Sequence, residues 1–187
     1  MVANHQDDDM PLVVGVSLGS HYACIALPSM DGPDAPPAVI ANPDGDRQIP
    51  VVFAYAPHVE DDGSIHIVPM IGSQAQAQKL RNLKYTVSEF MDVFGLNWDD
   101  ETVKSYRENP NYHGPALVKS EKDGGLAFML PDPSAVQSAD DTELPLLPIS
   151  VLDICTAYFK HLDDTVRHYI APKSPEGYCI SHPAHST

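Results

Sequence analysis

The residues best suited to chemistry lie near the start of the chain, in the stretch GVSLGSHYACIAL from Gly15 to Leu27. Two short apolar runs flank a small polar break made of Gly19, Ser20 and His21. In such a turn, successive backbone N–H groups and a hydroxyl can face a phosphate, because amides that line a concave turn bind anions. The same residues can instead do no more than close a β-hairpin.

The histidines and cysteines do not form a recognisable metal motif. His161 and His168 share one predicted helix, and His182 and His185 lie three residues apart near the C-terminus. No Cys-His spacing supplies the three or four convergent ligands that zinc requires. We therefore expect no metal ligand among these side chains.

The charge balance limits the classes of partner. The chain has 26 acidic and 11 basic residues and a net charge of −15, which repels nucleic acids and anionic membrane surfaces. Its cysteines, Cys24, Cys155 and Cys179, are too far apart for a C-x-x-C pair, as is typical of a reduced compartment. No secretory signal or long apolar run is present. We expect a cytoplasmic protein that binds neither nucleic acid nor membrane.

The elements that must position the polar turn are mostly strands in the first third of the chain. Alternating apolar residues and turn signals predict strands at 12–18, 21–27, 38–41, 51–56 and 65–68. Helical periodicity follows at 73–83, with Ser73 as its cap, and at 87–94, ended by Gly95. Residues 113–130 then predict strand, turn and strand.

A long helix is predicted from Val151 to Tyr169, because Ser150 followed by Asp153 resembles a capping box. Its expected buried stripe consists of Leu152, Cys155, Phe159, Leu162, Val166 and Tyr169. Trp98 is expected to be a half-buried anchor at the start of another helix, and a last strand begins at Tyr178.

In this order, four blocks of sequence resemble the beginning of the nucleotide-binding domain of DnaK-type chaperones, the heat shock protein 70 family. The blocks are GVSLGSHYACIAL, VIANPDGDRQIPVVFAY, IGSQAQAQKLRNLKYTVSEFMDVFGLNWDD and YCISHPA. The resemblance implies an α/β, actin-like ATPase (ribonuclease H-like) fold, incomplete, with the first lobe only and an inserted α+β subdomain. It implies an acidic, disordered N-terminus at 1–11, a core subdomain at 12–41 and 145–187, and the inserted subdomain at 42–144.

The resemblance also gives the polar turn a role. By position, Gly19, Ser20, His21 and Tyr22 would wrap the phosphates of ATP, bound with magnesium. No catalytic residue and no protein ligand to a metal is expected, because two charged groups of the family site are replaced.

Those two replacements are Ser17 and Gln76. Ser17 stands where the family has an aspartate that holds the waters of the magnesium ion, and a hydroxyl lacks the negative charge that a hard cation prefers. Gln76 stands where the family has a lysine beside the attacking water. Hydrolysis needs charges placed for the transition state, so we expect weak or absent ATP turnover while nucleotide binding survives.

Within the family, the altered turn and the missing lysine resemble the atypical subunit of the fungal ribosome-associated complex. That likeness implies a co-chaperone scaffold that assists protein folding at the ribosome, with a J-domain protein of zuotin type and ribosome-linked chaperones as partners. Two alternatives stay open: an active ATP-hydrolysing chaperone lobe, and a truncated inactive fragment of one.

Overall fold

The computed structural model describes residues 11–29, 34–61, 64–121, 124–134 and 144–181. These residues form a mixed α/β arrangement with three β-sheets. The chain divides into two compact units, the first made of residues 1–49 and 162–187 and the second of residues 50–161. The acidic stretch predicted to be disordered lies, except for Pro11, outside the described residues.

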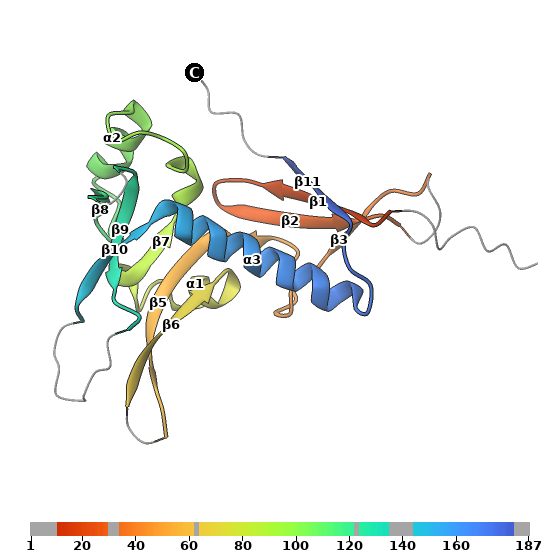
Figure 1. Cartoon of the computed structure of the whole chain (residues 1–187), viewed down its shortest axis with the longest axis horizontal. Helices are drawn as coiled ribbons and strands as arrows, with labels where there is room; N and C mark the ends of the chain where they lie inside the picture. Colours follow the sequence, from red (N-terminus) through yellow and green to blue (C-terminus); the bar gives the residue numbers. More distant parts are fainter. Residues whose placement is uncertain (1–10, 30–33, 62–63, 122–123, 135–143, 182–187) are drawn as a thin grey trace, which may run out of the picture. The chain divides into compact units, whose positions relative to one another are not determined.

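The first unit is built on a sheet with the strand order β11-β1-β2-β3, in which β4 also pairs with β2. Its strands are β1 (Val13–Leu18), β2 (Tyr22–Leu27), β3 (Ala38–Ile40), β4 (Ile49–Pro50) and β11 (Gly177–Ser181). The pairs β1–β2 and β2–β3 are antiparallel, whereas β11 lies parallel to β1 (Figure 1). The strands predicted at 12–18, 21–27 and 38–41 are confirmed to within one residue at each end.

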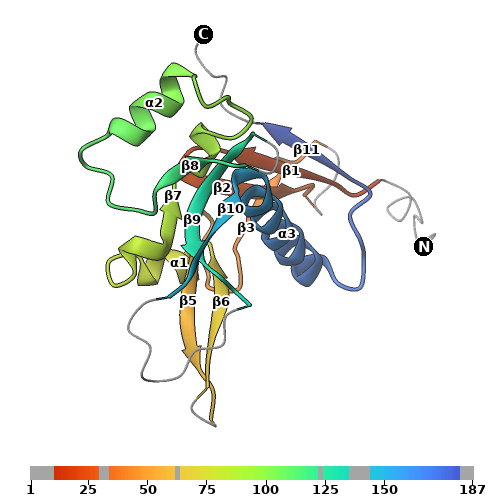
Figure 2. The same cartoon turned by 60° about the vertical axis from the view of Figure 1, so that its left-hand side comes forward.

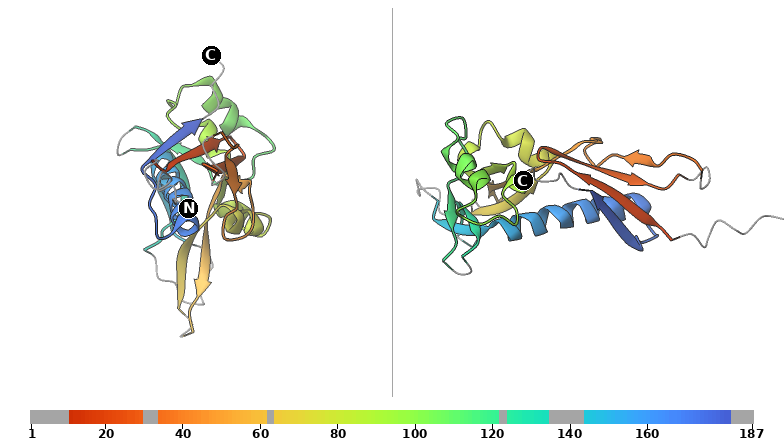
Figure 3. Two further views of the ribbon diagram at one scale, coloured as in Figure 1. Left: turned by 90° about the vertical axis from the view of Figure 1, so that its right-hand side faces the viewer. Right: turned by 90° about the horizontal axis from the view of Figure 1, so that it is seen from above.

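One face of this sheet is apolar and buried, as the strict alternation along its first two strands requires. The buried side chains are those of Val14, Val16, Leu18, Ala23, Ile25 and Leu27. The part of helix α3 (Val151–Ile170) from residue 162 onward belongs to the same unit and lies beside this sheet (Figure 3). The hydroxyl of Tyr178 on β11 donates to the Asp163 carboxylate on α3.

The second unit contains a sheet with the order β6-β5-β7. Its strands are β5 (Val52–Val59), β6 (Ile65–Ile71) and β7 (Thr86–Ser88), and helix α1 (Ser73–Gln78) packs on β5 and β6 (Figure 2). Ala75 of α1 is fully buried in a cluster with Val52, Ala54 and Met70. A helix with one buried residue is held by this sheet rather than by an apolar stripe of its own.

The other sheet of this unit has the antiparallel order β10-β9-β8. Its strands are β8 (Leu117–Lys119), β9 (Leu126–Pro131) and β10 (Leu146–Ser150), and helix α2 (Glu101–Glu108) lies in the same unit. The Tyr106 ring of α2 lies 6.0 Å from the Phe128 ring of β9 and 4.8 Å from the Tyr112 ring, measured between centroids. Burial raises the pKa of Tyr112 to about 12, so this cluster is neutral under ordinary conditions.

Trp98 is half-buried just before α2, as predicted, and the guanidinium of Arg107 lies 4.0 Å from its ring centroid. The N-cap of α2 is Asp100, whose carboxylate accepts from the Thr102 N–H at 2.8 Å. Trp98 therefore anchors the start of this helix through a cation–π contact with its last turn.

The helix predicted at 87–94 is wrong. Val87 lies in β7, and Glu89 then adopts a left-handed conformation with φ 59°, which starts a single 3₁₀ turn, η2 (Phe90–Asp92). The apolar spacing that predicted a helix does report burial. Val87 is buried in a strand, and Phe90 and Met91 are buried in the 3₁₀ turn, so no continuous helix is needed. Gly95 has a positive φ of 77°, as a chain-reversing glycine should.

The helix predicted at 73–83 is shorter than expected and is capped differently. α1 ends at Gln78, and a second 3₁₀ turn, η1 (Leu83–Tyr85), follows. Its N-cap is Gly72, with φ 64° and ψ −130°, and not Ser73. Such a backbone conformation favours glycine, so the residue that starts this helix is chosen by conformation rather than by a side-chain hydrogen bond.

The predicted helix at 151–169 is confirmed as α3. Ser150 Oγ accepts from the Asp153 N–H at 3.0 Å and donates to its carboxylate at 2.7 Å, so the cap is formed. The predicted stripe is wrong in part, because Leu152 and Tyr169 are exposed. The buried positions are Val151, Ile154, Cys155, Tyr158, Leu162, Thr165 and Val166.

Candidate functional site

The polar turn predicted to hold phosphate includes the three-residue loop between β1 and β2, made of Gly19, Ser20 and His21. Gly19 and Ser20 are half-buried, whereas His21 and Tyr22 are exposed. The Gly19 N–H donates to the Tyr22 carbonyl at 2.9 Å. A Cβ on residue 19 would come within 3.1 Å of that oxygen, so glycine allows the close approach that keeps the loop short.

The hydrogen bond at Gly19 decides which amides of the turn can serve a ligand. Because this N–H already donates to a carbonyl, it is not among the groups that a phosphate could meet at the turn. Neither Ser20 nor His21 has a positive φ. The four predicted residues are therefore brought together at one turn.

Ser17 lies two residues before Gly19, on the face of the sheet opposite to the buried one. It is exposed, and its direct neighbours across the sheet are Cys24 on β2 and Ser181 on β11. None of these three side chains is a carboxylate, although the resemblance places one at position 17. A magnesium ion is usually held by one or two carboxylates with phosphate oxygens and water. These residues therefore do not fit as magnesium ligands.

Gln76 belongs to the second unit and lies in the middle of α1. Its side chain is exposed, and its N–H donates to the Gly72 carbonyl at 2.9 Å. Lys79 follows one helical turn later, but its ammonium donates to Ser88 Oγ at 3.2 Å, which ties it to β7. Lys79 is a functional candidate that sequence reasoning missed, although its only signal, a cation three residues after Gln76, is present in the sequence.

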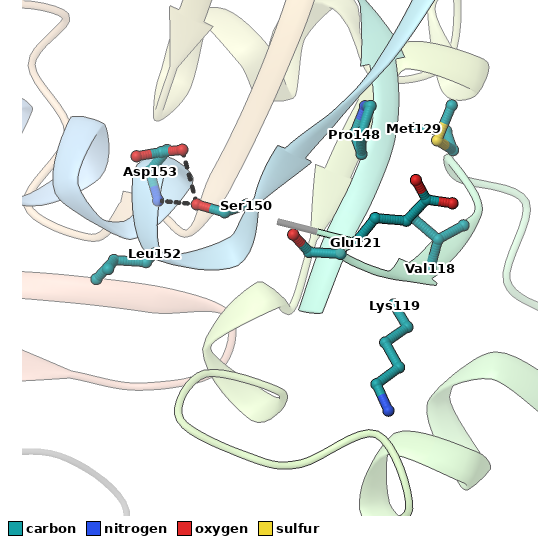
Figure 4. Close-up of a pocket in the computed structure, with 9 residues that line it drawn as sticks. Val118, Lys119, Glu121, Met129, Pro148, Ser150, Leu152 and Asp153 are labelled. Atoms are coloured by element: carbon teal, nitrogen blue, oxygen red, sulfur yellow. Dashed lines mark hydrogen bonds between the residues drawn. The ribbon is translucent and has the colours of Figure 1, made fainter. Parts of the chain in front are cut away.

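The second unit also contains an open pocket of about 680 Å³ beside the start of α3 (Figure 4). Strands β8, β9 and β10 contribute Val118, Met129 and Pro148 to its lining. The hydrogen bonds drawn in Figure 4 are those between Ser150 and Asp153, which cap α3. These polar groups of the wall therefore have a structural role in starting the helix.

The histidines weighed in the sequence do not assemble into a site of three. Across 11–29, 34–61, 64–121, 124–134 and 144–181, no group of three or more His, Cys, Asp or Glu side chains could hold a metal ion. His161 is half-buried and His168 exposed on α3, whereas His182 and His185 lie outside the described residues. None of the helices that the structure describes is long and apolar enough to cross a membrane.

Comparison with known proteins supports the family resemblance. A family model described as Hsp70 protein matches residues 13–127, more than half of the chain. A heat shock protein 70 homolog of Schizosaccharomyces pombe is 31% identical over 105 residues, which cover 55% of this chain and 16% of that protein. The heat shock 70 kDa protein 14 of Bos taurus is 30% identical over 93 residues, which cover 50% of this chain and 16% of that protein.

Proposed function

Because this chain belongs to the Hsp70 family, we propose that it is a chaperone-type nucleotide-binding protein with a degenerate ATPase site, which assists protein folding as a co-chaperone scaffold. The observation that carries the proposal is the uncharged, exposed Ser17 beside the β1–β2 turn. A turn that keeps its shape without its carboxylate can bind a phosphate and still fail to promote its transfer.

The proposed fold assignment is the first lobe of an actin-like domain. A meander of β1, β2 and β3 with β11 added in parallel on the other side of β1 supports a ribonuclease H-like core. The division into a core at 12–41 and 145–187 and an inserted subdomain at 42–144 stays a prediction. The matched residues cover only 16% of the length of each of the two relatives, so the activity of a whole family member is itself part of the proposal.

In the proposed binding mode, Gly19 keeps the hairpin tight, and Ser20 and His21 present N–H groups and a hydroxyl to the phosphates of ATP. Tyr22, which is 50% exposed, stands at the start of β2 beside them. Magnesium, when bound with ATP, supplies neutralisation of phosphate charge through its phosphate and water ligands. Ser17 contributes only a hydrogen-bonding hydroxyl to those waters.

The absence of efficient hydrolysis follows from charge. Phosphoryl transfer depends on positioning and on electrostatic stabilisation of the transition state, and loss of one such group costs about 10²–10³ in rate. Ser17 and Gln76 remove one anion and one cation from the site that the resemblance implies. The net charge of the site is unchanged by this exchange, so ground-state binding of nucleotide is less affected than turnover.

The partners proposed are a J-domain protein of zuotin type and ribosome-linked chaperones, in the cytoplasm. Support for them comes from the likeness of the altered turn and of Gln76 to the atypical subunit of the fungal ribosome-associated complex. The net charge of −15 favours recruitment through a protein partner over direct contact with ribosomal RNA.

The test combines calorimetric titration of ATP with magnesium and a phosphate-release assay on the same preparation, after circular dichroism has shown cooperative unfolding. We expect binding without turnover. The double variant Ser17→Asp, Gln76→Lys should raise any residual release, whereas His113→Gln, an exposed change elsewhere, should leave it unaltered.

Two other results would overturn the proposal in favour of the alternatives. Turnover comparable to that of a conventional family member would identify an active ATPase lobe. A cooperatively folded chain that binds no nucleotide would support an inactive fragment.

A further inference from the structure

Two histidines of the second unit are brought face to face by the register of the β5–β6 hairpin. Residues of β5 and β6 pair antiparallel from Phe53 with Ile71 to Val59 with Ile65, and this register puts His58 directly opposite His66. Directly opposed residues lie on the same face of a sheet, with Cβ atoms about 4.5–5.5 Å apart. Both histidines are exposed.

From this register we propose that His58 and His66 together bind a divalent late transition-metal ion, of the Zn²⁺ and Cu²⁺ class. Imidazole nitrogens suit these ions, and a zinc–nitrogen bond is about 2.0–2.1 Å long, so one ion between two opposed imidazoles spans the gap between the strands. The site is independent of nucleotide, because it uses no residue of the β1–β2 turn.

A neighbouring hydroxyl supports this role for His66. The Nε2 atom of His66 lies 3.2 Å from Ser64 Oγ. A ring whose Nε2–H donates to an oxygen presents Nδ1 as its lone pair, and metal-bound histidines are usually oriented by such a second hydrogen bond. In the tautomer with its proton on Nε2, His66 donates to Ser64 Oγ and Nδ1 is the atom that binds the ion.

The coordination is bidentate from this chain. In the part of the chain that the structure describes, no third His, Cys, Asp or Glu joins the pair in a group that could hold a metal. The remaining positions on the ion are filled by water. A two-imidazole site of this kind is weaker than a structural zinc site and is open to exchange.

The two histidines lie in a part of the β5–β6 hairpin that a bound metal ion would stabilise. β7 pairs with β5 only from Val52 to Ala54, so the part of the hairpin with His58 and His66 is a two-stranded ribbon (Figures 1 and 2). Isolated two-stranded ribbons are marginally stable in water. An ion held by one residue of each strand fixes their register and slows fraying of this end.

The sequence alone gave no indication of the site. The two histidines are separated by seven residues, a spacing that matches no metal motif, and only the register of the hairpin makes them neighbours. The histidines that sequence spacing did bring together, on α3 and near the C-terminus, are different ones.

Titration of the whole chain with ZnCl₂, followed by calorimetry and by NMR of the histidine ring protons, tests the proposal. We expect one ion per chain, shifts of the His58 and His66 ring signals, and slower amide hydrogen exchange at Val59 and Ile65. Either His58→Ala or His66→Ala should weaken binding more than about 10-fold, since loss of an outer partner of a ligand already costs about 10–100-fold.

Two controls separate this site from other histidines. His113→Ala removes an exposed histidine of the same unit and should leave the affinity unchanged. Deletion of residues 182–187 removes His182 and His185 and should also have no effect. Zinc affinity that survives the double change His58→Ala, His66→Ala, or that disappears with the deletion, would overturn the proposal.

Discussion

At the scale of single residues, the three cysteines differ in burial, which their positions in the sequence did not indicate. Cys24 is half-buried, Cys179 is exposed, and Cys155 is buried with its Sγ 3.9 Å from Met91 Sδ. Burial raises the pKa of the Cys155 thiol from 9.0 to about 12. The thiolate is the reactive form, so Cys155 is a packing residue rather than a nucleophile.

This raised pKa predicts a loss of stability in alkali. Below pH 9 the thiol is protonated in both the folded and the unfolded chain, so it has no effect on the pH dependence. Between pH 9 and about 12 the unfolded chain gives up this proton and the folded chain retains it, so unfolding becomes easier as pH rises. One such group contributes a slope of up to about 1.4 kcal/mol per pH unit.

Urea denaturation of wild type and of Cys155→Ala across this pH range measures the effect. The variant should have a lower free energy of unfolding at neutral pH and a flatter decline above pH 9. Cys179→Ala, which changes an exposed side chain, should keep the wild-type slope. Parallel declines for wild type and Cys155→Ala would contradict the assignment.

At the scale of elements, the cap of α3 was visible in the sequence but the direction of its buried face was not. Val151 and Leu152, and Tyr158 and Phe159, are adjacent apolar pairs, and a 3.6-residue period does not decide which member of each pair points inward. In the structure Ile154 is fully buried, whereas Leu152 is 62% exposed.

A matched pair of truncations tests this orientation. Ile154→Ala should lower the free energy of unfolding by about 2–5 kcal/mol, because it leaves a cavity in a packed core. Leu152→Ala, on the same helix turn, should change it by less than about 0.5 kcal/mol. Chemical denaturation of both variants is the measurement, and a larger loss of stability for Leu152→Ala than for Ile154→Ala would show that the stripe is oriented as the sequence suggested.

The strands of the first third were predictable because their signal is local. Alternation of apolar residues defined β1 and β2, and the hairpin between them followed from a short polar break. The segment around Val87 was not predictable, because the spacing of its apolar residues does not mark the left-handed Glu89 that interrupts it. β10 was missed as well, since Leu146 and Leu147 are exposed and carry no alternating pattern.

The candidate site was predictable only in its first part. Gly19 to Tyr22 do form one turn, but the hydrogen bond that occupies the Gly19 N–H is a property of geometry rather than of residue type. The opposed His58 and His66 depend on strand register, which spacing along the chain does not reveal. Motifs that act through a local turn are accessible to sequence, and those that act across strands are not.

At the scale of the whole molecule, a net charge of −15 and an exposed edge strand have opposite effects on the association of one chain with another. β11 is the outermost strand of its sheet, its residues Tyr178 to Ser181 are exposed, and it contains no charged residue or proline. Edge strands of this kind pair readily with another chain. Repulsion between like-charged molecules opposes that pairing, and salt screens the repulsion.

We therefore expect association of the chain to increase with salt. Sedimentation velocity in reducing buffer at about 0.1 M and about 1 M salt, where the Debye length falls from about 10 Å to about 3 Å, should show larger species at the higher concentration. Cys179→Lys places a charge on the edge and should suppress them, whereas Cys179→Ser should not. A monomer at both salt concentrations would contradict this expectation.

The parallel pairing of β11 with β1 also fixes an order of events during synthesis. Val13 pairs with Gly177, and an interaction between Leu12 and Glu176 beside them spans 164 residues. At a synthesis rate of about 5–20 residues per second, roughly 10–30 seconds pass between the synthesis of β1 and that of β11. During that interval one edge of β1 has no partner strand, so the nascent chain exposes a surface that chaperones can bind.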